Sequence, residues 1–511
     1  MKVTSLGHAG LEVQTTRATV LIDPWLSPEG AFLASWFQYP DNQHLMTPSL
    51  LEPTAIIFSH EHLDHLDPWF LAQVPTHIPA IIPRYSSPVL QRKILAAGHR
   101  KIVEALPWEP VELAEGTHVF FVPEESPMNH DSAVVIVGDG HTLLDLNDAR
   151  LSLSQLRSIR AKVGGAIDLL ALQGAGASWY PMCYEYTQER RRELSHRKRM
   201  AKFSYVDRAI KAVEPVTVIP FAGPPCFLDP DLAQFNAEME DGIFPDLQQV
   251  ADWLAEQGFK NISILLPGDR WDVTARTKDS DPIWNDFSFA DRRSYLESYA
   301  SRRSSQIAKV KACYPEPTDS LWEPFRGYFE RLLAMSPYFN QKIGMRVGFD
   351  IVGPGGGKWA VDFRPGSTGV FDEVGDCSYW YRFASRWLPP LLDETIPWED
   401  FFLSLRFQAW RNPDIYNDHL LGLLKFASLK ALEAVEDYET CMVSTERIAV
   451  HAEGRNYLVQ RYCPHAGLDL LDVGEVLPGG IFRCLGHHYE FNLETGQCLN
   501  GNCRLLDSKR V

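Results

Sequence analysis

The chain has 511 residues, of which 45% are hydrophobic and 23% charged, and its net charge is −17. This length predicts about three domains, and the composition excludes a disordered, collagen-like or coiled-coil protein. The excess of acidic residues argues against general binding to nucleic acid or to anionic membranes. Nine cysteines are too few for a disulfide scaffold in a chain of this length.

The start of the chain, MKVTSLGHAGLEV, does not combine a charged segment with a long apolar run, so no signal peptide is predicted. No uninterrupted apolar stretch approaches the roughly 18 residues that indicate a membrane-spanning helix. We therefore expect a cytoplasmic protein that is not inserted in a membrane.

Residues 1–275 alternate short runs rich in Val and Ile with polar stretches of helical pattern. Nearly continuous apolar runs are typical of strands buried on both faces. Helices are expected at 152–162 and 245–256, and the alternation predicts a layered α/β domain. The expected strands include 19–22, 55–58, 80–82, 118–122, 133–137, 142–146, 169–172, 216–219 and 262–266.

The rest of the chain divides into three further segments. Residues 276–337 are polar and helix-forming, which predicts a helical linker. Residues 338–434 contain two alternating runs joined by glycines, FDIVG and KWAVDF, which predict a hairpin, followed by amphipathic stretches at 398–409 and 417–432 that indicate helices. Short strands and glycine turns over 437–511 predict a small all-β domain.

A cluster of metal-ligating residues follows the expected strand at 55–58. The stretch AIIFSHEHLDHLDP places three histidines and one aspartate within six residues. A turn after a strand end lets such side chains point in two directions, so that they can hold two metal ions with N and O ligands. Exposed loop histidines are the alternative, which this dense spacing disfavours. The candidates are His60, His62, Asp64 and His65, joined by His130 and Asp148 at later strand ends.

This motif resembles that of the metallo-β-lactamase fold superfamily, and His8 in SLGHAG and Asp23 in LIDPWL are similar to the opening of its metal-dependent hydrolases. The resemblance implies an αββα sandwich over residues 1–275. It also implies that one metal is held by His60, His62 and His130 and the second by Asp64 and His65, with Asp148 between them.

One ligand position departs from the superfamily pattern. In most members a histidine after a late strand completes the second metal site, but VTVIPFAGPPC has Phe221 and Ala222 at that place. The second ion is then left with open positions, which suits iron that binds O₂ better than a closed zinc site. His8 could supply the missing contact or could support a ligand, and both alternatives stay open.

A second constellation lies near the C-terminus. Two thiolates and two imidazoles, each pair in a loop with Gly or Pro, are what a Rieske [2Fe–2S] cluster needs, and they give it a potential of roughly −150 to +300 mV. A Cys₂His₂ zinc site is the alternative, but the C-x-H spacing is unusual for zinc. The candidate ligands are Cys463 and His465 in CPH and Cys484 and His487 in CLGH, because the spacing selects His487 over His488.

The stretches around these motifs extend the resemblance. HYEFNLETGQC is similar to the segment after the second ligand pair of Rieske ferredoxins and oxygenases. LIDPWLSPEGAF, FSHEHLDHL, ASWYPMCY and VIPFAG resemble the CMP-N-acetylneuraminate hydroxylase family, in which the Rieske domain precedes the β-lactamase-like part. That family implies O₂, a small-molecule substrate, and NAD(P)H-derived electrons supplied through a separate ferredoxin, cytochrome or flavin reductase.

Zinc is redox-silent, so a Rieske cluster would have no evident acceptor if the first site held only zinc. We therefore predict one or two irons there and a monooxygenase that oxidises a small polar substrate. The basic run QERRRELSHRKRMAK could receive an anionic substrate, or it could be a solvated helix with internal ion pairs. The alternative function is a metal-dependent hydrolase with a structural or regulatory Rieske domain.

The middle segment, residues 338–434, resembles sterol-carrier-protein-2-like domains in its hairpin and later helices, which implies an α+β fold. Such domains can hold apolar ligands or build dimers, so a homo-oligomer is compatible with the sequence. A purely structural spacer is the alternative.

Overall fold

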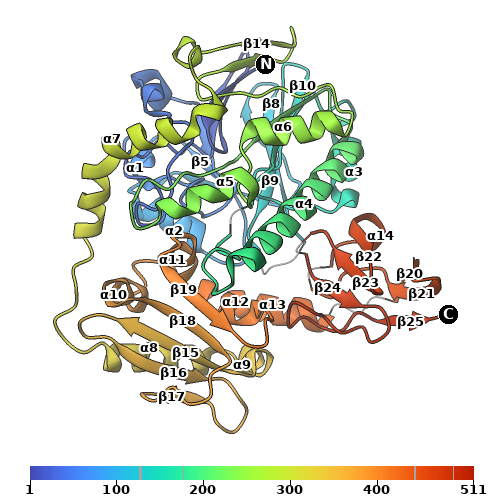
Figure 1. The fold of residues 1–511 in the computed structure, drawn as a ribbon. Helices are drawn as coiled ribbons and strands as arrows, with labels where there is room; N and C mark the ends of the chain where they lie inside the picture. The colour runs from blue at the N-terminus through green and yellow to red at the C-terminus, as the bar shows by residue number, and fades with distance from the viewer. Residues whose placement is uncertain (126–128, 177, 442–444, 466, 487) are drawn as a thin grey trace. The chain divides into compact units, whose positions relative to one another are not determined.

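The structure is a computed structural model that describes every residue except 126–128, 177, 442–444, 466 and 487. The chain forms two compact units (Figure 1). The first unit comprises Met1–Glu124, Asn129–Ala177 and Arg192–Ala308, and the second comprises Glu125–Met128, Ser178–Arg191 and Lys309–Val511. In the part of the chain that the structure describes, no helix has the length and apolar character needed to cross a membrane.

The first unit contains an eight-stranded sheet in the order β14-β13-β1-β2-β3-β4-β5-β6. Strands β3 to β6 run parallel to one another, and the remaining neighbours are antiparallel. Since β14 pairs with β13, this sheet continues past residue 275. The strands are β1 Lys2–Gly7, β2 Gly10–Gln14, β3 Thr19–Ile22, β4 Ala55–Ile57, β5 Ala80–Pro83, β6 Ile102–Ala105, β13 Arg270–Asp272 and β14 Thr277–Asp279.

A six-stranded sheet in the order β12-β11-β10-β9-β8-β7 forms the second layer of this unit. Its strands β10, β11 and β12 are parallel, and β7 to β10 are antiparallel. The Val- and Leu-rich central strands are almost wholly buried, as their composition predicts. The strands are β7 Val111–Ala114, β8 Thr117–Pro123, β9 Ser132–Gly138, β10 His141–Asp145, β11 Leu169–Gln173 and β12 Thr217–Phe221.

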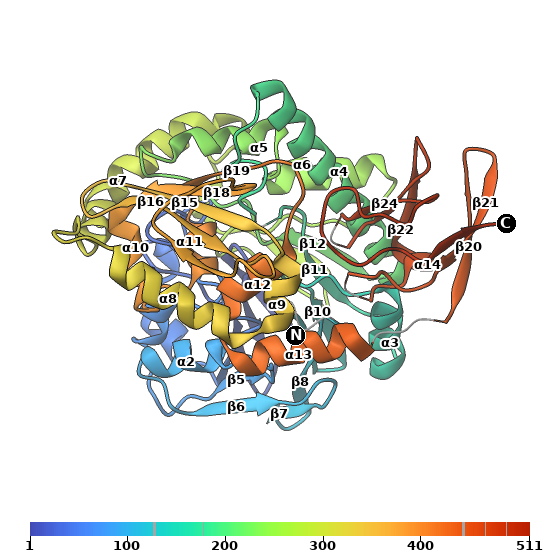
Figure 2. The same ribbon diagram turned by 90° about the horizontal axis from the view of Figure 1, so that it is seen from below.

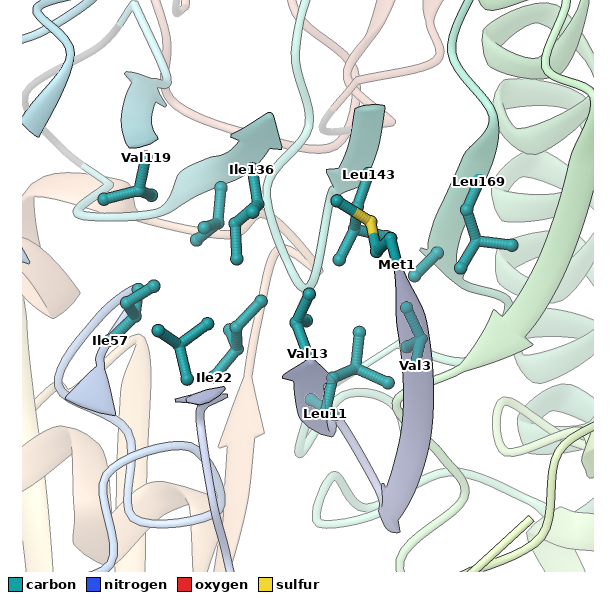
Figure 3. Packing of buried hydrophobic residues seen from close by; sticks show 14 of the residues in the cluster. Met1, Val3, Leu11, Val13, Ile22, Ile57, Val119, Ile136, Leu143 and Leu169 are labelled. Atoms are coloured by element: carbon teal, nitrogen blue, oxygen red, sulfur yellow. The ribbon is translucent and has the colours of Figure 1, made fainter. Parts of the chain in front are cut away.

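The hydrophobic core lies between the two sheets (Figure 3). Val3, Val13 and Ile22 point from the first sheet toward Ile136 and Leu143 of the second. All five are at most 1% exposed, and full burial of such a side chain stabilises a fold by about 1.5–3 kcal/mol. This interface therefore fixes the two sheets face to face.

Helices cover the outer faces of both sheets. Residues of α1 and α2 pack with Leu21 and Ile56 on the outer side of the first sheet. On the second sheet, Lys162 of α3 lies over the ring of Phe120 in β8, and α6 packs along β12. The prediction of an αββα sandwich is confirmed. These helices are α1 Pro68–Leu71, α2 Val89–Ala96, α3 Leu153–Val163, α4 Gln188–Val213, α5 Glu238–Asp241, α6 Leu247–Glu256 and α7 Arg292–Ala312.

The second unit contains a five-stranded sheet in the order β17-β16-β15-β18-β19. The hairpin predicted from the glycine-joined runs is present as antiparallel β15 and β16, and β15 pairs in parallel with β18. Phe325, Phe349 and Trp398 form an aromatic core between this sheet and its helices. The strands are β15 Arg346–Val352, β16 Gly357–Asp362, β17 Gly369–Phe371, β18 Tyr379–Ala384 and β19 Phe407–Arg411.

The helices of this part differ from the prediction at one place. The expected helix over 398–409 ends at Leu403, and its second half belongs to strand β19, where Phe407 and Ala409 are buried while Gln408 and Trp410 are exposed. Pairing with β18 decides this segment, because Tyr381 faces Ala409 across the ladder. The helices are α8 Trp322–Met335, α9 Pro337–Ile343, α10 Leu388–Leu392, α11 Trp398–Leu403, α12 Asp418–Phe426 and α13 Leu429–Cys441.

The end of the chain forms two antiparallel three-stranded sheets, β20-β21-β25 and β22-β23-β24 (Figure 2). The prediction of a small all-β C-terminal domain is confirmed. Its elements are β20 Arg447–Ala452, β21 Arg455–Gln460, α14 Leu470–Val473, β22 Gly474–Leu477, β23 Ile481–Cys484, β24 Glu490–Asn492 and β25 Ser508–Arg510.

Candidate metal centres

The candidate ligands of the first unit follow the ends of strands in both sheets. The two sheet edges meet there, since the Ala222 N–H after β12 donates to the His8 carbonyl after β1, at 2.9 Å. Left-handed backbone is concentrated at these strand ends, and such strained residues cluster at functional sites. The residues with positive φ at this edge are His8 (50°), Asp23 (44°), Asn147 (39°) and Ala222 (53°).

One group of ligand atoms comes from His60, His62 and Asp148, whose N and O atoms all lie within 4.8 Å of one another. Nε2 of His60 lies 2.9 Å from Nδ1 of His62. His60 and Asp148 are buried, and His62 is half-buried. Two imidazoles and one carboxylate are a donor set that suits iron, zinc and other transition metals.

A second group comes from His8, Asp64 and His65, again within 4.8 Å. Nε2 of His8 lies 2.9 Å from Oδ2 of Asp64. Nε2 of His65 is buried without a hydrogen bond, 3.9 Å from Asp64 and 3.5 Å from Oδ1 of Asp148. The same Asp148 carboxylate therefore adjoins both groups, which is where a carboxylate can bridge two ions.

Asp23 and Ser59 orient the histidine rings. Oδ2 of Asp23 lies 2.8 Å from Nδ1 of His65, and Oδ1 accepts the Ser59 N–H at 2.8 Å. The Ser59 hydroxyl lies 2.8 Å from Nδ1 of His60. Metal-ligating histidines commonly use their second nitrogen in this way, which leaves Nε2 for the ion. Asp23 forms a further group with His60 and His65, but its Oδ1 already accepts the Ser59 N–H and its Oδ2 already lies against Nδ1 of His65.

The buried carboxyl and imidazole groups of the site shift one another's pKa values. Burial opposes ionisation of Asp148, but the His65 imidazole outweighs it and holds the pKa of this carboxyl below its usual range. Burial would lower the pKa of His65, yet Asp64 and Asp148 raise it well above the ordinary value. Burial also raises the pKa of Asp145 well above its usual range. Buried carboxylates are stabilised by pairing or by metal coordination, so the residues present fit bound metal ions.

His130 lies outside these groups of the described residues. Its ring stacks on Tyr85 at 5.1 Å, and its Nδ1 is 3.4 Å from Oε1 of Glu61. Glu61, between His60 and His62, is also buried, and the sequence did not predict a role for its carboxylate. The assignment of His130 as a metal ligand stays a prediction.

Phe221, at the place of the missing histidine, is part of the core between the sheets. Its cross-strand partner Gln173, at the end of β11, instead reaches the site. The Gln173 amide donates to Oδ1 of Asp148 at 2.5 Å and accepts from Nζ of Lys202 at 2.8 Å. Gln173 was missed from the sequence, although it ends a strand as the candidate ligands do. Lys202 ends the basic run that the sequence singled out, but its contact with this site was not predicted.

The second unit presents the cysteines in two loops. Cys463 and Cys484 are each 1% exposed. The Cys463 N–H donates to the Leu468 carbonyl at 2.8 Å, and the Cys484 N–H donates to the Tyr489 carbonyl at 2.9 Å, so each thiol lies at the base of a closed turn. His487 lies outside the described residues.

The loop after Cys484 packs closely on the loop after Cys463, and a side chain at Gly486 would meet the Leu468 side chain. A Cβ at Gly486 would lie 2.0 Å from Cδ1 of Leu468, and its third neighbour is Sγ of Cys484 at 3.6 Å. The side chain of His465, two residues after Cys463, is 8% exposed. Two buried thiols in neighbouring loops, with a buried imidazole close to one of them in sequence, fit a [2Fe–2S] cluster.

Two family models match the chain. The model of the Beta-lactamase superfamily domain matches residues 18–217, and that of the Rieske [2Fe-2S] domain matches residues 425–505. The first match contains all the candidate ligands of the first unit except His8, and the second contains the four candidate cluster ligands.

The chain is also similar to curated proteins and to solved structures. A Rieske 2Fe-2S iron-sulfur protein of Mycolicibacterium smegmatis is 30% identical over 98% of both chains. The cytidine monophosphate-N-acetylneuraminic acid hydroxylase of Xenopus laevis is 22% identical, over 82% of this chain and 70% of its own. The solved structure of CmlA, a diiron β-hydroxylase from Streptomyces venezuelae, has 17% identity and a TM-score of 0.35, covering 55% of this chain and 54% of that one. The chain thus belongs to a family of Rieske 2Fe-2S iron-sulfur proteins in which a beta-lactamase superfamily domain is followed by the Rieske domain.

Proposed function

We propose that the protein is an O₂-dependent monooxygenase in which the Rieske cluster feeds electrons to one or two irons in the β-lactamase-type domain. The observation that carries this proposal is the combination, in one chain, of two adjoining N/O ligand groups with the buried cysteine loops of a Rieske domain. Iron bound at the first site would supply O₂ activation, for which a redox-silent zinc ion is unsuited. The related hydroxylases support the same class of reaction.

In this proposal the chain's own residues build and orient the site. The ligands are His60, His62 and Asp148 for one ion and His8, Asp64 and His65 for the other, with His130 as a further candidate. Asp23 and Ser59 fix the imidazole rings, and Gln173 fixes the Asp148 carboxylate. A site held by hydrogen-bonded supporting groups keeps its geometry without rearrangement, which favours catalysis.

We further propose that the substrate is a small polar molecule with an anionic group. Arg150, Lys198 and Lys202 lie close together, and Lys202 reaches the metal site through Gln173. Burial and the neighbouring Arg150 lower the pKa of both lysines to about 7. Glu124 and Asp148 lie near Lys202 as well, so these cations are partly balanced within the chain, and the group would attract a carboxylate or phosphate of the substrate.

The remaining elements of the proposal concern electron supply and location. A Rieske cluster accepts single electrons, which suits a ferredoxin, cytochrome or flavin reductase that draws on NAD(P)H. We also propose a cytoplasmic location, because nine cysteines in 511 residues are too few for a disulfide scaffold and suit a reducing compartment.

Metal analysis of protein purified without oxygen tests the proposal. About four irons per chain are expected, two in the cluster and two in the first unit, with about two acid-labile sulfides. Zinc in the first unit, with iron in the cluster alone, would contradict the oxygenase and support a hydrolase. Cluster iron with a first unit that binds no transition metal would contradict both.

A further inference from the structure

A carboxylate from outside the Rieske domain lies against the candidate cluster ligand His465. Oδ2 of Asp418, the first residue of α12, is 3.7 Å from Nε2 of His465. Tyr489 connects the two, because its ring packs on the His465 ring at 4.5 Å and its hydroxyl donates a hydrogen bond to the same Oδ2. Asp418 precedes the matched Rieske segment, which begins at residue 425, so a neighbouring part of the same unit supplies this charge.

Backbone contacts hold Asp418 in this position. The Tyr416 N–H donates to the Asn500 carbonyl at 3.1 Å, and the Asn502 N–H donates to the Tyr416 carbonyl at 3.0 Å, which joins the start of α12 to the C-terminal loop. The Asp418 N–H donates to Oδ1 of Asn502 at 3.2 Å. The loop fits only with glycine at 501, since a Cβ there would lie 2.0 Å from the Tyr489 ring. Several independent contacts therefore fix the position of Asp418.

The ring orientation assigns the two nitrogens of His465. A histidine that binds metal through one nitrogen presents the other to a carboxylate, a carbonyl or water. Nε2 of His465 lies 3.7 Å from Oδ2 of Asp418, so Nδ1 is the nitrogen that would bind a cluster iron. A negative charge beside an iron-bound imidazole stabilises the oxidised, more positive cluster relative to the reduced one. Net charge and hydrogen bonds near such clusters are known determinants of their potential.

We propose that Asp418 is a positioning residue that lowers the reduction potential of the Rieske cluster, and that the segment around α12 serves to hold it against His465. The hydroxyl of Tyr489 moderates this effect, because its hydrogen bond withdraws part of the negative charge from the shared oxygen. The proposal concerns the cluster alone and does not depend on which metal or reaction the first unit supports.

The test is an equilibrium redox titration of the full-length protein carrying its cluster, followed by the visible bands. Asp418→Asn keeps the shape and removes the charge, so the potential is expected to rise. Tyr489→Phe keeps the ring on His465 and removes the donor, so the potential is expected to fall. Because Tyr489 acts through Asp418, the double variant is expected to match Asp418→Asn alone.

Asp372→Asn serves as the matched control. It removes one negative charge from the exposed segment directly after β17 in the same unit, and it is expected to leave the potential unchanged. An Asp418→Asn protein with intact bands and the wild-type potential would overturn the proposal, as would an equal shift in the control. If Asp418→Asn does not assemble a cluster, Tyr489→Phe provides the test. A reduction potential of Tyr489→Phe equal to or above that of the wild type would contradict the proposed effect of the Asp418 charge. Failure of the oxygenase proposal would leave all of these potentials unaffected.

Discussion

At the scale of single residues, supporting side chains determine how the metal site is shaped. Gln173 lies between Lys202 and Asp148 and uses both ends of its amide. It is 6% exposed, so its hydrogen bonds are not shared with bulk water. Because Asp148 adjoins both ligand groups, the position of its Oδ1 affects both ions.

We expect Gln173→Leu to weaken metal binding in the first unit by about 10- to 100-fold, the usual cost of losing a hydrogen bond to a ligand. The substitution keeps much of the volume but removes the donor to Asp148. Competition of the protein with a chelator for iron or zinc measures the effect. Gln248→Leu, which removes an exposed amide paired with Asp252, is the control. Equal affinities for the wild type and Gln173→Leu would show that the amide does not hold the carboxylate.

The pH dependence of stability has a clear contributor in Glu439. Burial favours its neutral form, but His419 at 3.1 Å and the Tyr338 hydroxyl outweigh burial and lower its pKa from 4.5 to about 2. A carboxyl with a depressed folded pKa adds stability that is present above its unfolded pKa and is lost as the pH falls through the folded value. The loss is therefore expected between pH 4.5 and about 2.

Glu439→Gln removes this contribution. The apparent melting temperature of the variant is expected to lie below that of the wild type at pH 7, and the difference is expected to shrink as the pH falls from 4.5 toward 2. Melting curves across that range measure the difference. Glu433→Gln, an exposed carboxyl on the same helix, is expected to show no such convergence. A difference that stays constant with pH would contradict the assigned pKa.

At the scale of elements, the points at which helices end were harder to predict than the existence of the helices. The amphipathic stretch 417–432 is divided into α12 and α13 at Ala427, which has φ of 40°. Its N–H donates to the Leu423 carbonyl at 3.2 Å and closes α12 with a left-handed residue. Glycine is the usual residue at such a position, so the sequence contains no signal for this helix end.

Ala427→Gly is expected to stabilise the second unit by about 1 kcal/mol, because glycine adopts left-handed backbone without the steric cost that alanine bears. Ala434→Gly, inside α13, is the contrasting control and is expected to destabilise the unit by about 1 kcal/mol. Denaturant unfolding of the full-length protein measures both changes. A loss of stability in Ala427→Gly would show that the alanine side chain contributes more packing than the backbone strain costs.

At the scale of the whole molecule, a site residue was predictable from the sequence when its neighbours in the site are also close to it along the chain. The proximity of the candidate ligands between His60 and His65 was predictable because one strand end and one turn bring them together. The cysteines were predictable from their local spacing. The contact of Lys202 with Gln173 and the position of Asp418 were not, because each residue reaches its site from an element distant in sequence, and only the tertiary fold places it there.

The two metal centres lie in different units and should load independently. Cys463→Ala is expected to abolish the visible bands of the cluster while about two irons stay bound in the first unit. His60→Ala is expected to keep the bands and to lose iron from the first unit. Iron analysis and absorption spectra of the two variants measure this. Loss of the bands in His60→Ala would show that the cluster depends on the first site.

The helix α4 begins in the second unit and continues into the first, since Ser178–Arg191 belongs to one and the following residues to the other. The polypeptide thus returns to each unit after leaving it. No single break in the chain would therefore divide it into these two units, because residues 178–191 of the second unit stand between segments of the first. The segment that the Rieske model matches, residues 425–505, is by contrast one continuous stretch of the chain.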